Sequence, residues 1–367
     1  MSFYDTYLKY KNFDFKNFFN SVTENKIKYI LSKERINRLD FLSLLSEKAS
    51  GFLEDMALKS HKLTISNFGK VILLFIPIYI SDYCSNSCLY CGFSAKNKIQ
   101  RRHLNYDQIE TEAKKIAETG IKHILLLTGD APKIATVDYI KNSVKILKKY
   151  FSGIGIEIYA LTQNEYNILI QEGVDSLSIY QETYNEKLYA KLHPAGHKKD
   201  YHFRLNAPES ACMAKIRSVN IGALLGLDEW QKDAFFTGLH ADYLQNKYMD
   251  AEVSISLPRI RPHAGDFKIS HQITDKTFVQ IMTAIRIFMP RAGITVSTRE
   301  APEFRNNIIK LGVTKMSAGS SASVGGYALH NNDTKQFDIS DTRSVKKMEE
   351  AITKLNYQPV FKDWQTL

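Results

Sequence analysis

The chain has 367 residues, a hydrophobic content of 44% and a formal net charge of +10. That length suits one large α/β domain and exceeds what a small fold held together by metal ions or disulfides needs. The basic residues are scattered or form short clusters such as 96–98 and 198–199. This pattern favours a solvated basic surface over a nucleic-acid-binding face, so we expect no nucleic acid partner.

The N-terminal residues 1–16 are polar and aromatic and lack the apolar core of a secretory signal. The longest apolar run, 71–80, is too short to span a bilayer. Three of the four cysteines are clustered, which is not the pattern of a disulfide framework. We therefore expect a cytoplasmic protein with no membrane partner.

Charged, helix-like sequence fills residues 1–68, which we interpret as an N-terminal helical segment packed on the main domain. Within it, Leu39, Leu42, Leu45 and Leu53 recur at roughly helical spacing. This periodicity predicts a helix over residues 36–53.

From residue 70 onward, short apolar runs alternate with amphipathic segments. Eight runs read as strands, at 71–80, 123–128, 156–161, 176–180, 220–225, 252–257, 294–297 and 314–317. The segments between them read as helices, at 106–119, 137–150, 164–172, 208–218, 229–245, 275–288 and 302–311. This alternation predicts an α/β fold, a (β/α)8 TIM-type barrel over residues 69–320. Residues 321–367 are predicted to form a C-terminal extension packed on the barrel, with a helix at 345–355 and an irregular aromatic end.

Three cysteines directly follow the first predicted strand, where a barrel places its chemistry. Cys84, Cys88 and Cys91 have the spacing C-x3-C-x2-C. Three thiolates hold three irons of a cubane cluster and leave the fourth iron open to a substrate or cofactor. A zinc site is the alternative, but structural zinc takes four ligands, usually as two short pairs, and no second pair follows. Cys212 lies far away in a helical segment and is given no role.

The cysteine loop, with its aromatic residue before the last cysteine, resembles that of the radical S-adenosylmethionine (SAM) superfamily. Five further stretches are similar to the 2-iminoacetate synthase family, the tyrosine lyases of thiamine biosynthesis: PIYIS at 77–81, YQETY at 180–184, PRIRP at 258–262, STRE at 297–300 and GGY at 325–327. The resemblance extends from residue 35 to Trp364. Related tyrosine lyases of hydrogenase maturation carry additional cysteines near their C-terminus, whereas here none follows Cys212, which favours the thiamine family.

This resemblance implies a [4Fe–4S] cluster on Cys84, Cys88 and Cys91, with SAM on the open iron. Tyr90 and Phe93 would pack near the adenine, although plain loop packing explains them equally well.

Further contacts with SAM are implied beyond the loop. Thr128, Gly129 and Asp130 would receive the SAM amino group, although they have Thr and Asp where the superfamily usually has Gly and Glu. The remaining implied contacts come from Glu182 at the ribose, Arg204 at the carboxylate, and Gly222 and Gly226 near the adenine. The alternatives are a β-turn at 128–130, surface ion pairs for Glu182 and Arg204, and ordinary strand-end glycines.

L-Tyrosine is the substrate that the resemblance implies, and its carboxylate needs a fixed cation. Arg299, at the end of the seventh predicted strand, is our first choice, because a planar guanidinium grips a carboxylate bidentately. Tyr79 would face the substrate, and Ser317 and Ser320 are candidates for its amino end; a packed barrel tyrosine and structural serines are the alternatives. The base that takes the phenol proton is not identified among Glu300, His263 and Tyr327.

The implied reaction is radical SAM cleavage of the Cα–Cβ bond of L-tyrosine to 2-iminoacetate (dehydroglycine) and p-cresol, which supplies the thiazole moiety of thiamine. A flavodoxin- or ferredoxin-type electron donor and a thiazole synthase that receives the unstable imine are the implied protein partners. Three alternatives remain open: another aromatic amino acid radical lyase, acting on tryptophan or in hydrogenase maturation, a zinc-dependent nucleic-acid-binding protein, and an iron–sulfur electron carrier.

Overall fold

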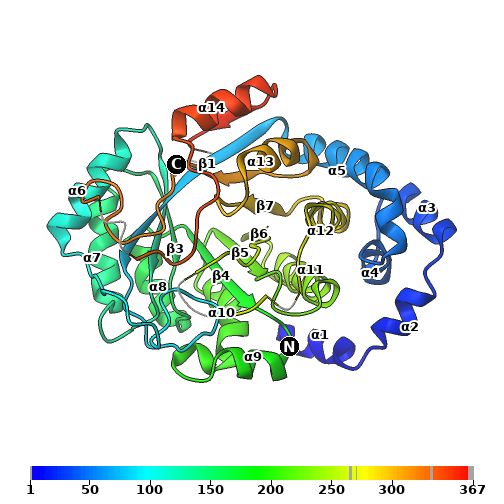
Figure 1. Ribbon diagram of the computed structural model, residues 1–367, viewed down its shortest axis with the longest axis horizontal. Coiled ribbons are helices and arrows are strands. Elements are labelled where there is room, and N and C mark those ends of the chain that lie inside the picture. The colour runs from blue at the N-terminus through cyan, green and yellow to red at the C-terminus, as the bar shows by residue number, and fades with distance from the viewer. Residues whose placement is uncertain (1, 264–266, 270, 331–333, 363–367) are drawn as a thin grey trace.

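The computed structural model describes residues 2–263, 267–269, 271–330 and 334–362. In this part of the chain eight parallel strands close into a barrel, because β1 pairs with β2 as well as with β8, and helices cover the outside (Figure 1). The predicted (β/α)8 barrel is therefore confirmed. Its strands are β1 (Val71–Ser81), β2 (His123–Thr128), β3 (Gly153–Glu157), β4 (Ser176–Glu182), β5 (Ser218–Ala223), β6 (Glu252–Ser256), β7 (Gly293–Val296) and β8 (Lys315–Ser317).

The first strand, β1, pairs with three others along its length. Its first residues pair with β9 (Gln358–Val360), its middle residues with β8 and its last residues with β2. The strands β9 and β2 thus cover the same edge of β1 in succession, which protects that edge from pairing with another chain. The sequence prediction of an irregular end missed β9, whose Pro359 is tolerated because β9 pairs with β1 alone.

Strand β3 begins three residues earlier than the predicted run 156–161. Gly153 and Gly155 lie outside the predicted run, and the barrel needs small residues at both positions. A Cβ at Gly153 would lie 2.3 Å from the His123 ring, and one at Gly155 would lie 2.6 Å from the Ser176 hydroxyl. Neighbouring strands therefore approach β3 so closely that only glycine fits at these two positions.

The outer helices alternate with the strands as predicted, except that α9, between β4 and α10, was not predicted. They are α6 (Tyr106–Ala117), α7 (Val137–Leu147), α8 (Gln163–Glu172), α9 (Glu186–Leu192), α10 (Tyr201–Met213), α11 (Trp230–Lys247), α12 (Asp275–Phe288) and α13 (Pro302–Ile308). The predicted start of α10 at Pro208 is wrong. The Asp200 side chain accepts a hydrogen bond from the Phe203 amide and caps the helix earlier, so Pro208 lies inside it.

Five helices precede the barrel: α1 (Phe3–Lys11), α2 (Phe15–Asn20), α3 (Glu24–Ser32), α4 (Arg38–Leu44) and α5 (Leu53–Phe68). The predicted continuous helix over 36–53 is wrong, because α4 ends at Leu44 and a short 3-10 turn leads into α5. The Gln280 side chain on α12 donates hydrogen bonds to the carbonyls of Leu44 and Ser46, at 3.0 and 2.8 Å. A neighbouring helix thus satisfies the carbonyls that the break leaves free.

After β8 the chain crosses the top of the barrel before α14 (Val345–Lys354) and β9. Residues 335–341, which we term the strap, bond to several barrel loops through their backbone. The Gly92 amide donates to the Gln336 carbonyl, and the amides of Ser340 and Asp341 donate to the Thr298 carbonyl. The strap therefore belongs to the wall of the barrel mouth.

The predicted boundaries between the N-terminal segment, the barrel and the C-terminal extension, at 68/69 and 320/321, stay a prediction. Trp364, where the family resemblance ends, lies outside the described residues.

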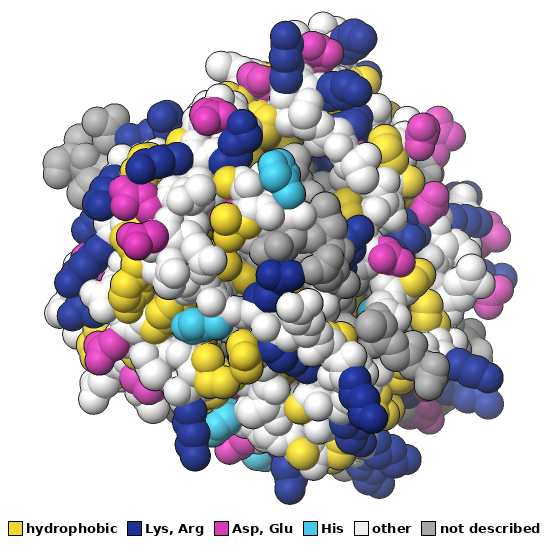
Figure 2. Space-filling view, turned by 60° about the vertical axis from the view of Figure 1, so that its left-hand side comes forward, with side chains coloured by type: hydrophobic (Ala, Val, Ile, Leu, Met, Phe, Trp, Pro, Cys, Tyr) yellow, Lys and Arg dark blue, Asp and Glu magenta, His cyan; other side chains and the backbone are white. Residues whose placement is uncertain are grey.

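Lys and Arg side chains are dispersed over the visible face of the molecule, with Asp and Glu among them (Figure 2). Among the described helices, none combines the length and apolar character needed to cross a bilayer.

Candidate functional site

Two neighbouring cavities open at the carboxyl ends of the strands. The thiol cavity is lined by the three clustered cysteines, and the barrel cavity extends down among the strands toward His123 and Lys315. They hold about 1030 Å³ (barrel cavity) and 960 Å³ (thiol cavity) of space free of protein atoms, open solvent included. Both are therefore large enough for a small organic molecule. Six residues line both cavities and define the junction between them: Leu127, Glu157, Tyr180, Pro258, Arg299 and Phe337.

Cys84, Cys88 and Cys91 lie around the thiol cavity on an irregular loop after β1. Arg101 fixes this loop, since its guanidinium donates to the carbonyls of Asp82, Phe93 and Ser94 at 2.6–2.8 Å. Burial raises the pKa of the Cys84 thiol to about 11 and that of Cys88 to about 12. A thiolate here thus needs a positive partner, which a metal centre provides.

No three His, Cys, Asp or Glu side chains of the described residues converge on one point where a single ion could sit. A cubane cluster needs a different arrangement, in which each thiolate binds its own iron around a shared volume. Three thiols spaced around one cavity, with no histidine or fourth cysteine among the described residues that line it, fit a [4Fe–4S] cluster that has an open iron.

Asp130 reaches the same cavity from the end of β2. One carboxylate oxygen accepts a 2.7 Å hydrogen bond from the Asn86 side chain, while Oδ1 is buried without a partner in the described structure, as is the Thr128 hydroxyl. Gly129 is required for packing, since a Cβ there would lie 2.3 Å from the Tyr83 carbonyl oxygen. The two orphaned oxygens are suited to receive a ligand's amino group.

Glu182 ends β4 with a backbone φ of 71°, in the left-handed region that non-glycine residues rarely adopt. Its side chain is buried and forms an ion pair with Lys198. Burial by itself would raise the pKa of Glu182, but the positive charges of Lys198 and Arg204 outweigh it and lower that pKa. The sequence interpretation placed Lys198 on the solvated basic surface, which is wrong, because only 13% of its side chain is exposed.

Arg204 on α10 also lines the thiol cavity and is not the surface ion pair that the alternative reading suggested. Its Nε donates to the Tyr180 carbonyl at 3.0 Å, which aligns the guanidinium along the end of β4.

Tyr90 and Phe93 line the thiol cavity as well. The Tyr90 hydroxyl lies 2.6 Å from Nε2 of His193, and the Phe93 ring meets Tyr79 edge-on with 5.9 Å between centroids. Both aromatic residues are therefore fixed, and Phe93 connects the cysteine loop to the barrel cavity.

Gly222 and Gly226 are not among the residues that line either cavity, although their neighbour Leu224 is. A Cβ at Gly222 would lie 2.4 Å from the Ser256 carbonyl oxygen, and Gly226 has a φ of 113°. These two glycines thus allow the backbone conformation that places Leu224 at the cavity. Their contact with adenine stays a prediction.

Tyr79, Ser317 and Ser320 all line the barrel cavity. Tyr79 donates to the Gln336 side chain on the strap at 2.8 Å, and Ser317 accepts from the Thr298 amide at 3.0 Å. The Ser320 hydroxyl is buried without a partner in the described part of the chain. No sequence signal pointed to Gln336, because the strap follows the barrel strands by many residues and has no motif.

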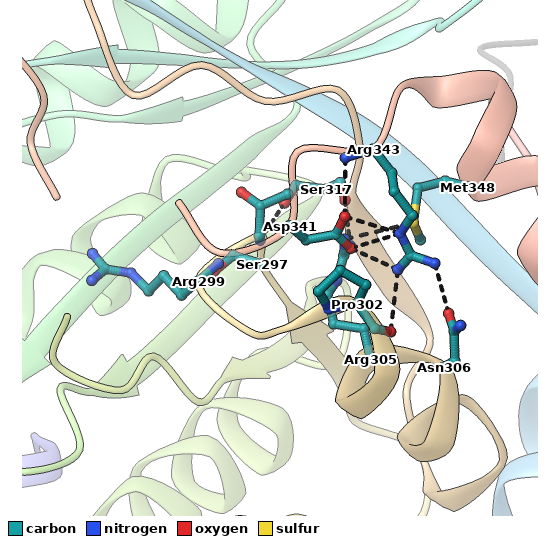
Figure 3. A network of polar contacts seen from close by, with 10 residues as sticks. Ser297, Arg299, Pro302, Arg305, Asn306, Ser317, Asp341, Arg343 and Met348 are labelled. Atoms are coloured by element: carbon teal, nitrogen blue, oxygen red, sulfur yellow. Dashed lines mark hydrogen bonds and ion pairs between the residues drawn. The ribbon is translucent and has the colours of Figure 1, made fainter. Parts of the chain in front are cut away.

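Arg299 lies at the junction, at the end of β7. Its guanidinium is 3.3 Å from the centroid of the Phe337 ring, and no described carboxylate lies within ion-pair distance of it. It points away from the ion pairs that Arg305 and Arg343 make with Asp341 on the other side of its loop (Figure 3). Burial lowers the pKa of Arg299, while Tyr79 and Glu157 act in the opposite direction. A half-buried guanidinium stacked on an aromatic ring and open to both cavities is suited to bind a carboxylate.

Glu157, which the sequence analysis did not select, faces Arg299 at the junction. Burial raises the pKa of Glu157 to about 7, although Arg299 opposes the shift.

Of the three residues considered as a base for the phenol, two already have polar partners and one lies outside both cavities. Glu300 is ion-paired with Arg259 and Arg261. The Tyr327 hydroxyl donates to the Pro77 carbonyl at 2.6 Å, and His263 lines neither cavity. Identification of that base stays open.

Residues 78–236 match the family model of the radical SAM superfamily, and residues 256–358 match that of the biotin and thiamin synthesis associated domain. The chain is 36% identical to 2-iminoacetate synthase of Escherichia coli (strain K12) over 348 residues, which is 95% of this chain and 92% of that protein. It is 34% identical to 2-iminoacetate synthase of Salmonella typhimurium (strain LT2) over the same shares of both chains.

Among solved structures, HydG, a maturase of the [FeFe]-hydrogenase, is similar with a TM-score of 0.91 at 29% sequence identity. The similarity covers 96% of this chain and 80% of HydG. Sequence and structure comparisons thus each cover almost the whole chain.

Proposed function

This chain belongs to the 2-iminoacetate synthase family of the radical SAM superfamily, and we propose the residues with which it acts on its substrate. It is a radical SAM carbon–carbon lyase that cleaves the Cα–Cβ bond of L-tyrosine to 2-iminoacetate and p-cresol. The observation that carries the assignment of residues is Arg299, a half-buried cation without an ion-pair partner among the described residues, at the junction of the thiol and barrel cavities.

A [4Fe–4S] cluster with SAM, when bound, supplies the 5′-deoxyadenosyl radical that starts the reaction. Cys84, Cys88 and Cys91 hold the cluster, and Asp130 receives the SAM amino group through its orphaned oxygen. The negative charge of Glu182, maintained by Lys198, suits it to accept hydrogen bonds from the two ribose hydroxyls.

Arg299 binds the tyrosine carboxylate, and the aromatic ring extends into the barrel cavity between Tyr79 and the strap. The Ser320 hydroxyl, buried and without a partner in the described structure, offers a hydrogen bond to the substrate. Ser317 orients the backbone next to Arg299, because its hydroxyl accepts from the Thr298 amide. This arrangement fixes the Cα–Cβ bond beside the thiol cavity and keeps water away from it.

The imine product hydrolyses in water, so we also propose direct transfer to a thiazole synthase. A flavodoxin- or ferredoxin-type protein would provide the electrons, and a reducing cytoplasm would preserve the cluster. Co-purification of the tagged chain with a thiazole synthase is the expected result, and a pull-down without association would count against this partner.

The function is tested by anaerobic reconstitution followed by turnover with SAM, tyrosine and dithionite. We expect p-cresol and 5′-deoxyadenosine, and neither from the Cys88→Ala variant. Protein that cleaves SAM but forms no p-cresol would contradict the tyrosine lyase assignment. Replacement of tyrosine by tryptophan, with product analysis, distinguishes this activity from that of other aromatic amino acid lyases.

A further inference from the structure

We propose that Glu157 binds the amino group of the substrate tyrosine and accepts a proton from it during the reaction. This inference rests on the proposed function, because it concerns how the same site handles the same substrate. Ser317 and Ser320, the residues expected at the amino end, offer hydroxyls for hydrogen bonding but no base for a proton at neutral pH.

The reaction itself requires an acceptor for a proton. Tyrosine enters as an ammonium ion at neutral pH, with three hydrogens on its nitrogen, whereas 2-iminoacetate, HN=CH–COO⁻, has one. A carbon radical removes a hydrogen atom, one proton and one electron, from a single N–H bond. The other hydrogen leaves as a proton, and its bonding electron pair stays on nitrogen as a lone pair. That proton needs a base within hydrogen-bond distance of the amino group.

The position of Glu157 matches this need. It is the last residue of β3, at the carboxyl end of the barrel, in register with Leu127 of β2. Like Arg299, it lines both cavities, and each of the two groups lies within electrostatic range of the other. An α-amino acid carries its two opposite charges on neighbouring groups of one carbon atom. A cation and an anion that both line the junction and interact electrostatically therefore match the head of an amino acid.

Two of the other carboxylates at the cavities have ion-pair partners, since Glu182 is paired with Lys198 and Glu300 with Arg259 and Arg261. Asp130 accepts from Asn86 with one oxygen, and its other oxygen is assigned to the SAM amino group. Glu157 makes no ion pair in the described part of the chain, so a bound ammonium group would be its first ion-pair partner there.

The environment prepares Glu157 for proton transfer near neutral pH. Burial raises its pKa to about 7, because it disfavours the charged form. The charged and titratable groups that face it come from four elements: Arg299 after β7, Glu182 and Tyr180 on β4, Arg204 on α10 and Tyr79 on β1. A base whose pKa lies near the working pH both takes up and releases a proton readily.

Substrate analogues test the contact directly on the reconstituted enzyme with SAM bound. 3-(4-Hydroxyphenyl)propionate keeps the ring and carboxylate of tyrosine and lacks only the amino group. We expect the wild type to bind tyrosine at least about tenfold more tightly than this analogue, because a charged hydrogen bond is lost. In Glu157→Gln the two affinities should become similar, whereas Glu157→Asp should restore part of the difference.

Turnover provides the second measurement. In Glu157→Gln, p-cresol formation should fall about 100-fold or more, the usual effect of losing a general base, while uncoupled SAM cleavage and cluster absorbance persist. The fall in wild-type kcat/KM as the pH drops below about 7 should be absent from this variant. Glu252→Gln is the matched control, because it removes one carboxylate at the opposite end of the barrel, where 68% of the side chain is exposed.

A Glu157→Gln variant that retains both the preference for tyrosine over the analogue and normal p-cresol formation would overturn the proposal. So would loss of turnover with an unchanged preference, since that pattern indicates a structural role. Failure of the wild type to form p-cresol would overturn the proposed function instead, and the analogue comparison would still decide on Glu157.

Discussion

Arg299 is the residue on which the choice of substrate depends. Its half-buried charge has no carboxylate partner in the described structure, and desolvation lowers the pKa of its guanidinium. A fold that retains such a group uses it for a ligand more often than for stability.

We predict that Arg299→Met abolishes p-cresol formation and spares uncoupled SAM cleavage, because methionine fills the space but cannot bind a carboxylate. Its free energy of unfolding should equal or exceed that of the wild type, since no ion pair is lost. Chromatographic product assays and urea unfolding measure the two effects. A large fall in stability would show that Arg299 has a structural role.

Glu157 should give the stability of the enzyme a distinctive pH dependence. Its pKa is raised from 4.5 to about 7 in the folded chain, so between these values the native state holds a proton that the unfolded chain has lost. Stability from this group is therefore present below about pH 4.5 and lost as the pH rises toward 7.

We predict that Glu157→Gln raises the free energy of unfolding at pH 8 by about 1–3 kcal/mol, a value discounted because part of the side chain faces the cavity. The free energies of unfolding of the wild type and the variant should become equal at pH 4.5. Urea titrations at both pH values test this. Equal stability at pH 8 would mean that the carboxylate is not desolvated in the folded enzyme.

The cysteines and Arg299 could be selected from the sequence because their signals are local. The cysteines have a fixed spacing, and Arg299 follows a predicted strand. It missed Glu157 for a physical reason. In an apolar run a lone charge usually faces solvent, but in β3 the outward residues Ile154 and Ile156 pack beneath the helices. The inward positions Gly155 and Glu157 then line the cavity. Period-two alternation combined with the barrel fold would have placed this glutamate inside.

At the level of elements, the alternation of strands and helices was predictable and the ends were less so. Proline usually begins helices and interrupts strands, yet Pro208 lies inside α10 and Pro359 inside β9. Pro208 is acceptable because Asp200 caps α10 eight residues upstream. Pro359 is acceptable because β9 pairs with one strand only, β1. Such exceptions depend on tertiary neighbours, which a single sequence does not reveal.

Asp341 connects the strap to the barrel, as Figure 3 shows. It pairs with Arg305, whose side chain is fully buried, and with Arg343 at 2.6 Å. Arg305 also donates to the Ser317 carbonyl at the end of β8. These contacts hold α13, β8 and the strap in one arrangement beside Arg299.

We predict that Asp341→Asn lowers the free energy of unfolding by about 3–5 kcal/mol, because it leaves a buried guanidinium without its countercharge. Arg343→Gln, which leaves the buried pair intact, should cost about 1 kcal/mol or less. Urea unfolding at pH 7 compares them, and hydrogen exchange should show loosening in residues 335–341 of the first variant only. Equal effects of both substitutions would contradict this account.

For the whole molecule, the N-terminal helices close one side of the barrel. Phe3 on α1 stacks on His240 of α11 with 4.0 Å between ring centroids, and Tyr7 packs on Phe236 at 4.8 Å. The Tyr4 hydroxyl donates to Glu186 on α9 at 2.8 Å. Since these contacts reach two barrel helices, we expect the N-terminal segment and the barrel to unfold together.

Phe3→Ala tests this cooperativity. Phe3 is 1% exposed, so its loss should lower the free energy of unfolding by about 3–5 kcal/mol. Circular dichroism of the helices and tryptophan fluorescence should still report a single shared urea midpoint, shifted downward for both. Leu8→Ala on the same helix, at a side chain 49% exposed, should leave the midpoint nearly unchanged.

In Phe3→Ala, p-cresol formation per folded molecule should match the wild type, because both cavities lie at the strand ends and neither includes α1. Two separate transitions, with only the helical signal shifted, would show that the first helices fold independently of the barrel.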